Sequence, residues 1–396
     1  MKKAFLAGAG VLLSVLAFFP YQATFPVSAG PDLTFSGGLI DAFEAEIIEQ
    51  PVWLPRHAVG EFDGDGKDEA AVDFGTAGIH IYDQGAWSQI SAADAESLLA
   101  ADPDGDHIDE ILADLGSLGL WIWNAGAWNQ LSGVNAENIA AIDVDADGAD
   151  DVVGDFGAAG LWLNNGGAWT QLSGLNADYV ATANLEGTGL AEIIGDFGAN
   201  GLWLWKAGVW TQLSGVNSDY VTSGVKAGVG RYLIGDFGPT GLWKWDAGIW
   251  TQLSGVNADY TIAANITGTA GGDGIVGDFG PTGMWLLSED LGGWTQLSGA
   301  NADFMVRSDM GWPNEVVADF GSSGVWMCSR PWIPGPGSDS PAYGAWTQLS
   351  GVNSDYLLVG DIDGDSADEI FADFGTLGLW LWDGGTRSRI SPDNPD

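Results

Sequence analysis

The sequence predicts an all-β protein, an eight-bladed β-propeller of four-stranded antiparallel blades. One unit of roughly 41 residues recurs through most of the chain. Each copy contains four short strand-like segments separated by turn residues, which is the pattern of a propeller blade. The chain of 396 residues also contains 61 Gly and 21 Trp, which suits tight turns between sheets that pack through large rings.

The repeat is marked by the tripeptide Asp-Phe-Gly, with one Asp-Leu-Gly variant. The first seven copies start 40 to 42 residues apart, and the last interval is 54 because a Pro/Gly-rich insert, residues 330–344, interrupts the seventh repeat. The markers begin at Asp73, Asp114, Asp155, Asp196, Asp236, Asp278, Asp319 and Asp373.

The third copy gives the strand pattern. Its strand-like segments are residues 138–143, 151–156, 160–164 and 169–173, each of typical strand length. No segment between them is long enough for the helices of a parallel α/β fold. A β-solenoid is the other repeat architecture, but its coils are usually shorter. All eight copies look complete, and the alternative of seven blades would leave one unit unpacked.

The repeats occupy residues 57–391, and the rest of the chain divides around them. Residues 1–29 are expected to form a signal peptide, with Lys2 and Lys3, an apolar run, and the small-residue triplet Val27-Ser28-Ala29. A membrane anchor is the alternative, which Pro20 disfavours. Residues 30–56 form a non-repeat segment and residues 392–396 a tail. We therefore expect a secreted protein, extracellular or periplasmic, with no membrane span after cleavage.

The charge of the chain limits its partners. Twelve Lys and Arg against 54 Asp and Glu give a net charge of −42. This charge would repel nucleic acid and anionic membranes, and it suits the binding of cations.

Four repeats carry acidic residues at alternate positions between the first and second strands. Carboxylates at positions 1, 3, 5 and 9, with the backbone carbonyl at position 7, can converge on one Ca²⁺, which prefers six to eight oxygen ligands. The alternative is a solvated acidic turn without metal. We expect up to about four structural calcium ions, because the spacing recurs in one structural place. In order from position 1 to position 9, the ligands would be Glu61, Asp63, Asp65, Lys67 and Glu69; Asp102, Asp104, Asp106, Ile108 and Glu110; Asp143, Asp145, Asp147, Ala149 and Asp151; and Asp361, Asp363, Asp365, Ala367 and Glu369.

These loops are not EF-hands, because position 12 lacks Glu and strands flank them. The segment from Glu61 to Glu69, followed by a strand and Asp73-Phe74-Gly75, resembles the FG-GAP/VCBS-type repeats of integrin-α-like propellers. The resemblance covers residues 57–391 and implies a propeller with calcium in four units. The class includes adhesion receptors, a fungal lectin and non-catalytic regions of secreted bacterial enzymes. The Trp-rich second half of each repeat departs from the integrin pattern and is closer to the lectin-like members.

The connectors between repeats are candidates for ligand binding. In an antiparallel blade they share one face with the second-to-third turns, opposite the acidic loops. Asn and Asp beside an aromatic ring can grip a sugar, although Asn and Asp in connectors often bond their own backbone instead. The candidates are Asn176, Asp178 and Tyr179; Asn217, Asp219 and Tyr220; Asn257, Asp259 and Tyr260; and Asn353, Asp355 and Tyr356. Most Trp residues are expected to pack between blades.

The sequence favours a binding protein over an enzyme. The chain has three His residues and no nucleophile elbow, zinc motif or phosphate loop. A propeller-type polysaccharide lyase would need basic residues, which are scarce. Equal copies also suit multivalent binding better than catalysis. The expected partner is a glycan, which would make the protein lectin-like. The alternative is an adhesion or protein-interaction scaffold that binds an extracellular protein without a sugar site.

Overall fold

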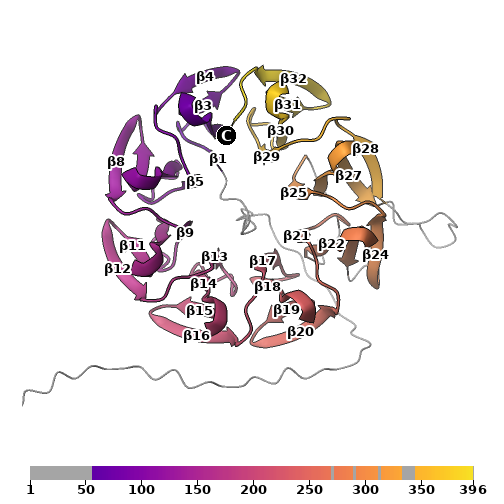
Figure 1. Ribbon diagram of the computed structural model, residues 1–396, viewed down its shortest axis with the longest axis horizontal. Helices are drawn as coiled ribbons and strands as arrows, with labels where there is room; N and C mark the ends of the chain where they lie inside the picture. The colour runs from indigo at the N-terminus through magenta and orange to yellow at the C-terminus, as the bar shows by residue number, and fades with distance from the viewer. Residues whose placement is uncertain (1–55, 269–271, 289–290, 311–313, 332–343, 396) are drawn as a thin grey trace, which may run out of the picture.

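A computed structural model describes residues 56–268, 272–288, 291–310, 314–331 and 344–395. The expected signal peptide, nearly all of the segment 30–56 and most of the insert 330–344 lie outside the described residues. In the described ranges the protein consists of eight four-stranded antiparallel sheets arranged in a ring, with a 3-10 turn in every blade (Figure 1). The predicted eight-bladed propeller is confirmed, and the seven-bladed alternative is wrong.

Each blade is formed by four consecutive strands, so no strand is exchanged across the closure of the ring. The first strands surround the centre and are β1 (His57–Gly60), β5 (Ser97–Ala101), β9 (Asn138–Ile142), β13 (Tyr179–Ala183), β17 (Tyr220–Val225), β21 (Tyr260–Ala264), β25 (Phe304–Ser308) and β29 (Tyr356–Gly360). The second strands are β2 (Glu69–Asp73), β6 (Glu110–Asp114), β10 (Asp151–Asp155), β14 (Glu192–Asp196), β18 (Arg231–Asp236), β22 (Gly274–Asp278), β26 (Glu315–Asp319) and β30 (Glu369–Asp373).

The outer half of each blade follows the same pattern. The third strands are β3 (Ile79–Asp83), β7 (Leu120–Asn124), β11 (Leu161–Asn165), β15 (Leu202–Lys206), β19 (Leu242–Asp246), β23 (Met284–Ser288), β27 (Val325–Pro331) and β31 (Leu379–Asp383). The fourth strands form the rim and are β4 (Ala86–Gln89), β8 (Ala127–Ser132), β12 (Ala168–Ser173), β16 (Val209–Ser214), β20 (Ile249–Ser254), β24 (Gly293–Ser298), β28 (Gly344–Gln348) and β32 (Thr386–Ser391).

The strands predicted in the third repeat agree with β9 to β12 to within one residue at each end. The sequence reasoning missed the 3-10 turns that follow the second strands. They are η1 (Gly75–Ala77), η2 (Gly116–Leu118), η3 (Gly157–Ala159), η4 (Gly198–Asn200), η5 (Gly238–Thr240), η6 (Gly280–Thr282), η7 (Gly321–Ser323) and η8 (Gly375–Leu377). The glycine after each turn has a positive φ. At Gly119, for example, a Cβ would lie 2.2 Å from the Ser132 carbonyl oxygen, so no larger residue fits there.

Burial follows the radial order of the strands. The second strand is buried along its whole length in most blades, because neighbouring blades cover both of its faces. The core is therefore a series of apolar layers between blades, each containing residues from two adjacent sheets. Cys328 is buried in one such layer, as a small apolar residue would be.

The rim tryptophans connect neighbouring blades, as the sequence predicted. Trp128 Nε1 donates to the Ile90 carbonyl oxygen of the preceding blade at 2.9 Å, and five further interfaces repeat this bond. Across the closure, Trp87 donates to the Ile390 carbonyl oxygen of blade 8 at 3.0 Å. The same contact therefore joins the first and last blades of the ring. Blade 8 differs, because Arg387 replaces the tryptophan and lies over the rings of Trp380 and Trp382.

The aspartate of the repeat marker holds each connector. Asp114 is fully buried, and its Oδ1 accepts the Gly116 N–H at 3.1 Å while its Oδ2 accepts the Ala136 N–H at 3.2 Å. The next residue, Glu137, donates its N–H to the Asp155 carbonyl oxygen of the following blade at 2.7 Å. One aspartate thus fixes where the chain leaves its blade. Burial raises the pKa of Asp114 to about 6.

Candidate functional site

The first-to-second loops and the third-to-fourth turns share one face, which we call the loop face. Residues at the ends of third strands contact these loops: Asn124 Nδ2 donates to Asp104 Oδ2, and Asn165 Nδ2 to Asp145 Oδ2, each at 2.8 Å. The connectors and the 3-10 turns form the opposite face, which we call the connector face. The predicted separation of acidic loops from connectors is therefore found in the structure.

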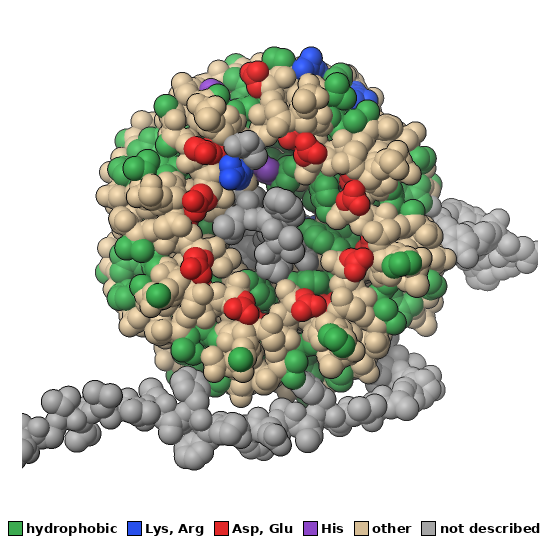
Figure 2. Space-filling view, viewed as in Figure 1, with side chains coloured by type: hydrophobic (Ala, Val, Ile, Leu, Met, Phe, Trp, Pro, Cys, Tyr) green, Lys and Arg blue, Asp and Glu red, His purple; other side chains and the backbone are tan. Residues whose placement is uncertain are grey.

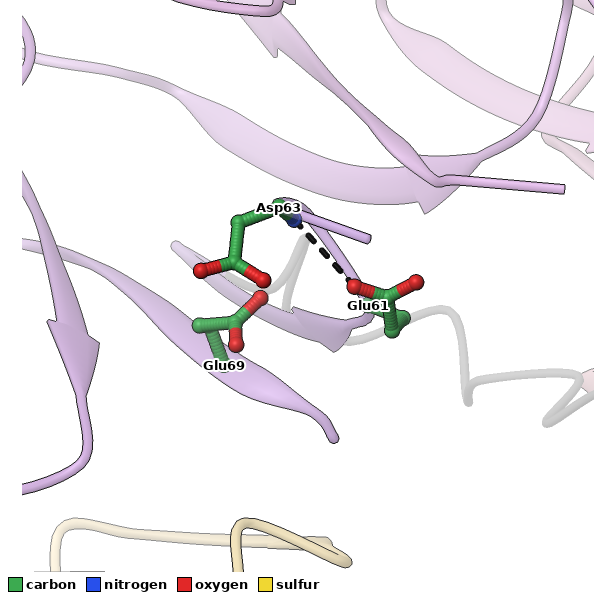
Figure 3. Close-up of side chains that lie close together, drawn as sticks. All are labelled: Glu61, Asp63 and Glu69. Atoms are coloured by element: carbon green, nitrogen blue, oxygen red, sulfur yellow. Dashed lines mark hydrogen bonds between the residues drawn. The ribbon is translucent and has the colours of Figure 1, made fainter. Parts of the chain in front are cut away.

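The structure brings several of the predicted calcium ligands together. In blades 1 to 3, one oxygen from each of positions 1, 3 and 9 lies within 4.8 Å of the others. Figure 3 shows this arrangement for Glu61, Asp63 and Glu69, with the Asp63 N–H directed at Glu61. In blade 8 the corresponding groups are Asp361 with Asp363 and Asp365, and Asp363 with Glu369 and Asp383.

Position 1 of each loop also organises the backbone. Asp102 accepts the N–H groups of Gly105 and Asp106 on Oδ1 and that of His107 on Oδ2. The backbone of the loop therefore folds around the Asp102 carboxylate. The position-5 carboxylates lie outside the three-residue groups of blades 1 to 3, and each accepts the N–H of position 7, such as Lys67 N–H on Asp65 Oδ1.

The position-9 carboxylate lies beneath the loop. Glu69 is 1% exposed; its Oε2 accepts the Phe62 N–H at 2.6 Å, and its Oε1 has no hydrogen-bond partner. Glu110 is 2% exposed and has an unpartnered Oε2. Burial, with the neighbouring carboxylates, raises the pKa of both residues to about 8. A buried carboxylate with a free oxygen is costly, and a cation would offset that cost.

Blade 4 contains a cation of its own at the same place. Lys206 Nζ lies 2.8 Å from Glu186 Oε2 and 2.6 Å from Glu192 Oε1, and these two residues occupy positions 3 and 9 of the fourth loop. Lys206 ends the third strand, where blades 2 and 3 have Asn124 and Asn165. The ammonium group therefore sits between the carboxylates that correspond to Asp104 and Glu110.

The sequence analysis missed two kinds of residue on the loop face. Asp83 and Asp383, at the ends of β3 and β31, add a further carboxylate to loops 1 and 8. They lie about 20 residues from their loops in the sequence, so the spacing within the loop does not include them. Polar residues recur at the equivalent turns, where Gln84, Asn124 and Asn165 donate to loop carboxylates. The second kind is the acidic residue at position 8 of a loop. Asp109 donates its N–H to the Glu61 carbonyl oxygen at 2.7 Å, and its Oδ2 accepts the Glu61 N–H at 3.1 Å.

This reciprocal pair links position 8 of one loop to position 1 of the preceding loop, and we call it the loop clamp. It recurs between Asp150 and Asp102 and between Asp368 and Asp309. Across the closure, Asp68 donates to the Asp361 carbonyl oxygen at 2.9 Å and accepts the Asp361 N–H at 3.0 Å. Blades 8, 1, 2 and 3, which carry the acidic loops, are therefore consecutive and joined by clamps.

On the connector face, acidic side chains surround the centre of the ring (Figure 2). Two of them accept a hydrogen bond from the asparagine of the next connector: Asn135 Nδ2 donates to Glu96 Oε2 at 3.1 Å, and Asn176 Nδ2 to Glu137 Oε2 at 3.0 Å. The amides of Asn217 and Asn257 lie instead against the marker aspartates Asp196 and Asp236. Blade 1 keeps the arrangement with other residues, because Arg56 Nη1 lies 3.4 Å from Asp94 Oδ1. The exposed acids of the connectors are Asp94, Glu96, Glu137, Asp178, Asp219, Asp259, Asp303 and Asp355.

The predicted ligand-binding residues are only partly available on this face. Asn176, Asn217, Asn257 and Asn353 are exposed with their acidic neighbours. Tyr179 and Tyr220 are only 3% and 4% exposed, so their rings face the core and cannot stack on a ligand. Tyr260 and Tyr356 are half-buried. The prediction of tyrosine stacking is therefore wrong for Tyr179 and Tyr220, because the first strand turns its first side chain inward.

Tryptophans, half-buried except for the buried Trp243, lie near the 3-10 turns of this face instead. Trp121 Nε1 donates to the Leu118 carbonyl oxygen at 2.9 Å, and Gln130 Nε2 donates to the same oxygen. The pattern recurs at Trp162, Trp203, Trp243, Trp285 and Trp326. The connectors on this face also expose aliphatic side chains, among them Val134, Val256 and Val352.

Comparison with known proteins supports the fold alone. No protein-family model matches the chain, and no curated protein matches its sequence. The FG-GAP/VCBS resemblance therefore stays a prediction. Among solved structures, the chain is similar to BBS1N in complex with ARL6DN, at 11% identity and a TM-score of 0.51 over 76% of this chain and 99% of that one. It is also similar to the exotype rhamnogalacturonan lyase YesX, at 15% identity and a TM-score of 0.55 over 81% and 70% of the two chains.

The BP39L lectin from Burkholderia pseudomallei matches at 15% identity and a TM-score of 0.46, over 86% of this chain and 99% of that chain. The protein is a β-propeller. Within the described ranges, none of its helices is long and apolar enough to cross a membrane.

Proposed function

We propose that this protein is a secreted binding module in which calcium ions, up to about four of them, stabilise one arc of the propeller and the connector face binds carbohydrate multivalently. The observation that carries the cation part is Lys206. One blade supplies an ammonium group to the loop carboxylates, at 2.6 and 2.8 Å, where four others gather carboxylates. Several carboxylate oxygens gathered in one loop are the hard ligands that Ca²⁺ prefers.

The cation proposal is tested by calorimetry on the chelator-treated protein. Calcium is expected to bind with a stoichiometry of up to about four and to raise the melting temperature. Glu110→Gln should remove one ion and leave the others, because each loop supplies its own ligands. Asp246→Asn is the matched control, since Asp246 pairs with Lys226 and belongs to no acidic loop. Unchanged melting with no bound calcium would refute this part.

Several features of the connector face support a carbohydrate ligand. Exposed asparagines and carboxylates recur in the connectors, two of these amides are hydrogen-bonded to a carboxylate, and indole rings lie on the same face. Hydroxyl groups of a sugar can accept hydrogen bonds from the amides and donate hydrogen bonds to the carboxylates. An indole ring can pack against the apolar side of the sugar. Equal copies would raise the avidity for a polymeric or surface-bound glycan without strengthening any single contact.

Glycan-array binding followed by calorimetry tests this part. A bound glycan should lose affinity stepwise when Asn135, Asn176 and Asn217 are replaced by alanine singly and together. Thr170→Ala, on an exposed rim strand, is the matched control. A clean negative array would remove the sugar site and leave the alternative, an adhesion or protein-interaction scaffold.

We also propose that the protein is not an enzyme. Of its three histidines, His57 is 7% exposed and burial lowers its pKa to about 3, which suits no general base at neutral pH. Incubation with rhamnogalacturonan and other acidic polysaccharides should produce no unsaturated sugar. Secretion is tested by fractionating cells that express the chain with and without residues 1–29.

A further inference from the structure

A cavity of about 180 Å³ lies between blades 2 and 3 on the loop face. Blade 2 contributes the acidic residues Asp104 and Glu110 and the side chains of Ile122 and Asn124 to its wall. Across the interface it is lined by residues of blade 3, which are Asp150, Val152, Asn164, Gly166 and Gly167. The cavity therefore adjoins the candidate cation site of loop 2 directly.

Two departures from the repeat make room for this cavity. Asn164 pairs with Val152 in the sheet at the register where Trp123 pairs with Ile111 and Trp205 with Ile193. Those tryptophans fill the interfaces between blades 1 and 2 and between blades 3 and 4. Gly166 likewise stands where blades 2 and 4 have Ala125 and Ala207. Blade 3 has thus lost a large ring and a methyl group on one side.

The walls combine polar groups with an apolar floor. Glu110 is 2% exposed, and its unpartnered Oε2 belongs to a side chain that lines the cavity. Asn164 is 7% exposed and accepts the Gly167 N–H on Oδ1 at 3.0 Å. Ile122, Val152 and Leu131 supply the apolar part. Three carboxylates exclude an anionic ligand, and the apolar floor favours one with a carbon skeleton.

We propose that this cavity binds a small neutral polyol, a sugar or sugar alcohol, whose vicinal hydroxyl groups complete the ligand shell of the cation in loop 2. The inference rests on the cation part of the proposed function. The volume corresponds to about six waters at about 30 Å³ each, which is the size of a small sugar rather than an oligosaccharide. Calcium accepts up to eight oxygen ligands, more than one short loop provides.

Loop 2 would thus have a role that loops 1 and 3 lack. Trp123 and Trp205 occupy the equivalent space beside loops 1 and 3, so a ligand cannot reach those ions from between the blades. This site is also distinct from the connector face, because Asp104 and Asn124 lie on the opposite side of the ring.

Ligand-observed NMR and calorimetry test the proposal on the calcium-loaded protein, with D-xylose, glycerol and propane-1,3-diol as probes. We expect D-xylose and glycerol to bind and propane-1,3-diol, which lacks a vicinal pair, to fail. Asn164→Trp should weaken D-xylose binding at least tenfold while ion stoichiometry stays unchanged. Gly166→Ala, which only narrows the cavity, should weaken it less. Asn165→Ala is the matched control, because that side chain contacts loop 3, and it should leave the D-xylose affinity within twofold.

Several results would overturn the proposal. One is D-xylose binding that persists in chelator, and another is D-xylose binding that survives Asn164→Trp in a folded protein. A third is a cavity that binds none of the diols although loop 2 holds its ion. Loss of D-xylose binding in the connector variant Asn176→Ala would also overturn it, because that residue lies on the other face. Failure of the ions to bind at all would instead refute the proposed function.

Discussion

Replacing Lys206 by alanine would remove the one ammonium group that lies among the loop carboxylates of blade 4. Glu192 is 2% exposed and would keep its carboxylate without the partner at 2.6 Å. Breaking a buried pair from one side costs about 3–5 kcal/mol. Because the Lys206 side chain is 28% exposed and reached by water, we expect a smaller loss, about 2–3 kcal/mol of unfolding free energy.

The assay is thermal unfolding of the chelator-treated protein, followed by titration with calcium. A loss of this size should lower the melting temperature by only about 3–4 °C, because the unfolding entropy grows with the length of the domain. Lys226→Ala is the matched control. Its ammonium lies 2.6 Å from Asp246 Oδ1, but that carboxylate is 40% exposed, so the loss should stay below about 1 kcal/mol.

Calcium distinguishes a lost cation from lost packing. If the place of Lys206 is a cation site, calcium should restore part of the stability of Lys206→Ala beyond the gain seen in the unchanged protein, because Glu186 and Glu192 become available as ligands. The control should show no extra gain. A melting temperature within 1 °C of the parent in Lys206→Ala, or a loss that calcium fails to reduce, would refute the reasoning from blade 4 to the acidic loops.

Three further predictions concern the loop clamp, the pH and the closure of the ring. Asp109→Ala should cost about 1–3 kcal/mol of unfolding free energy, because the Glu61 N–H loses its acceptor, and denaturant unfolding that is unchanged would contradict this. Burial raises the pKa of Asp155, Asp236 and Asp278 to about 6, above the value in the unfolded chain, so the folded state binds protons more readily. The stability that they contribute below about pH 4 should therefore be lost as the pH rises through about 6. Melting of the chelator-treated protein from pH 4 to 7 checks the sign, and a melting temperature that rises over this range would be inconsistent with it. Asp68→Ala should cost as much as Asp109→Ala but should also speed amide exchange in β1 and β29, which no covalent link joins. Exchange that accelerates equally in both variants would argue against a weak point at the closure.

The sequence by itself determined the number of blades, their strands and the loops that gather carboxylates. These features are local or strictly periodic: turn glycines and short apolar strands recur in all eight units, and the alternate acidic positions recur in four of them. The tryptophans that open the fourth strands could be assigned to the interfaces for the same reason. The resemblance to a repeat family added an expectation of calcium and no further certainty about ligands.

Only the tertiary structure decided which residues meet between blades. Position 8 reads as one more acidic residue in the sequence, yet its neighbour in space is position 1 of the preceding loop, 48 residues away for Asp109. Lys206 reads as a surface lysine until β15 brings it to Glu186 and Glu192. Tyr179 and Tyr220 read as exposed connector residues, but strand pairing turns them inward. Asn164 stands in the sequence only as a replacement for a tryptophan, and the structure shows that it lines a cavity together with Glu110 of the neighbouring blade. The alternation of side chains along a strand and the repeat of about 41 residues specify each blade. Contacts between blades depend on how the closed ring brings distant segments together.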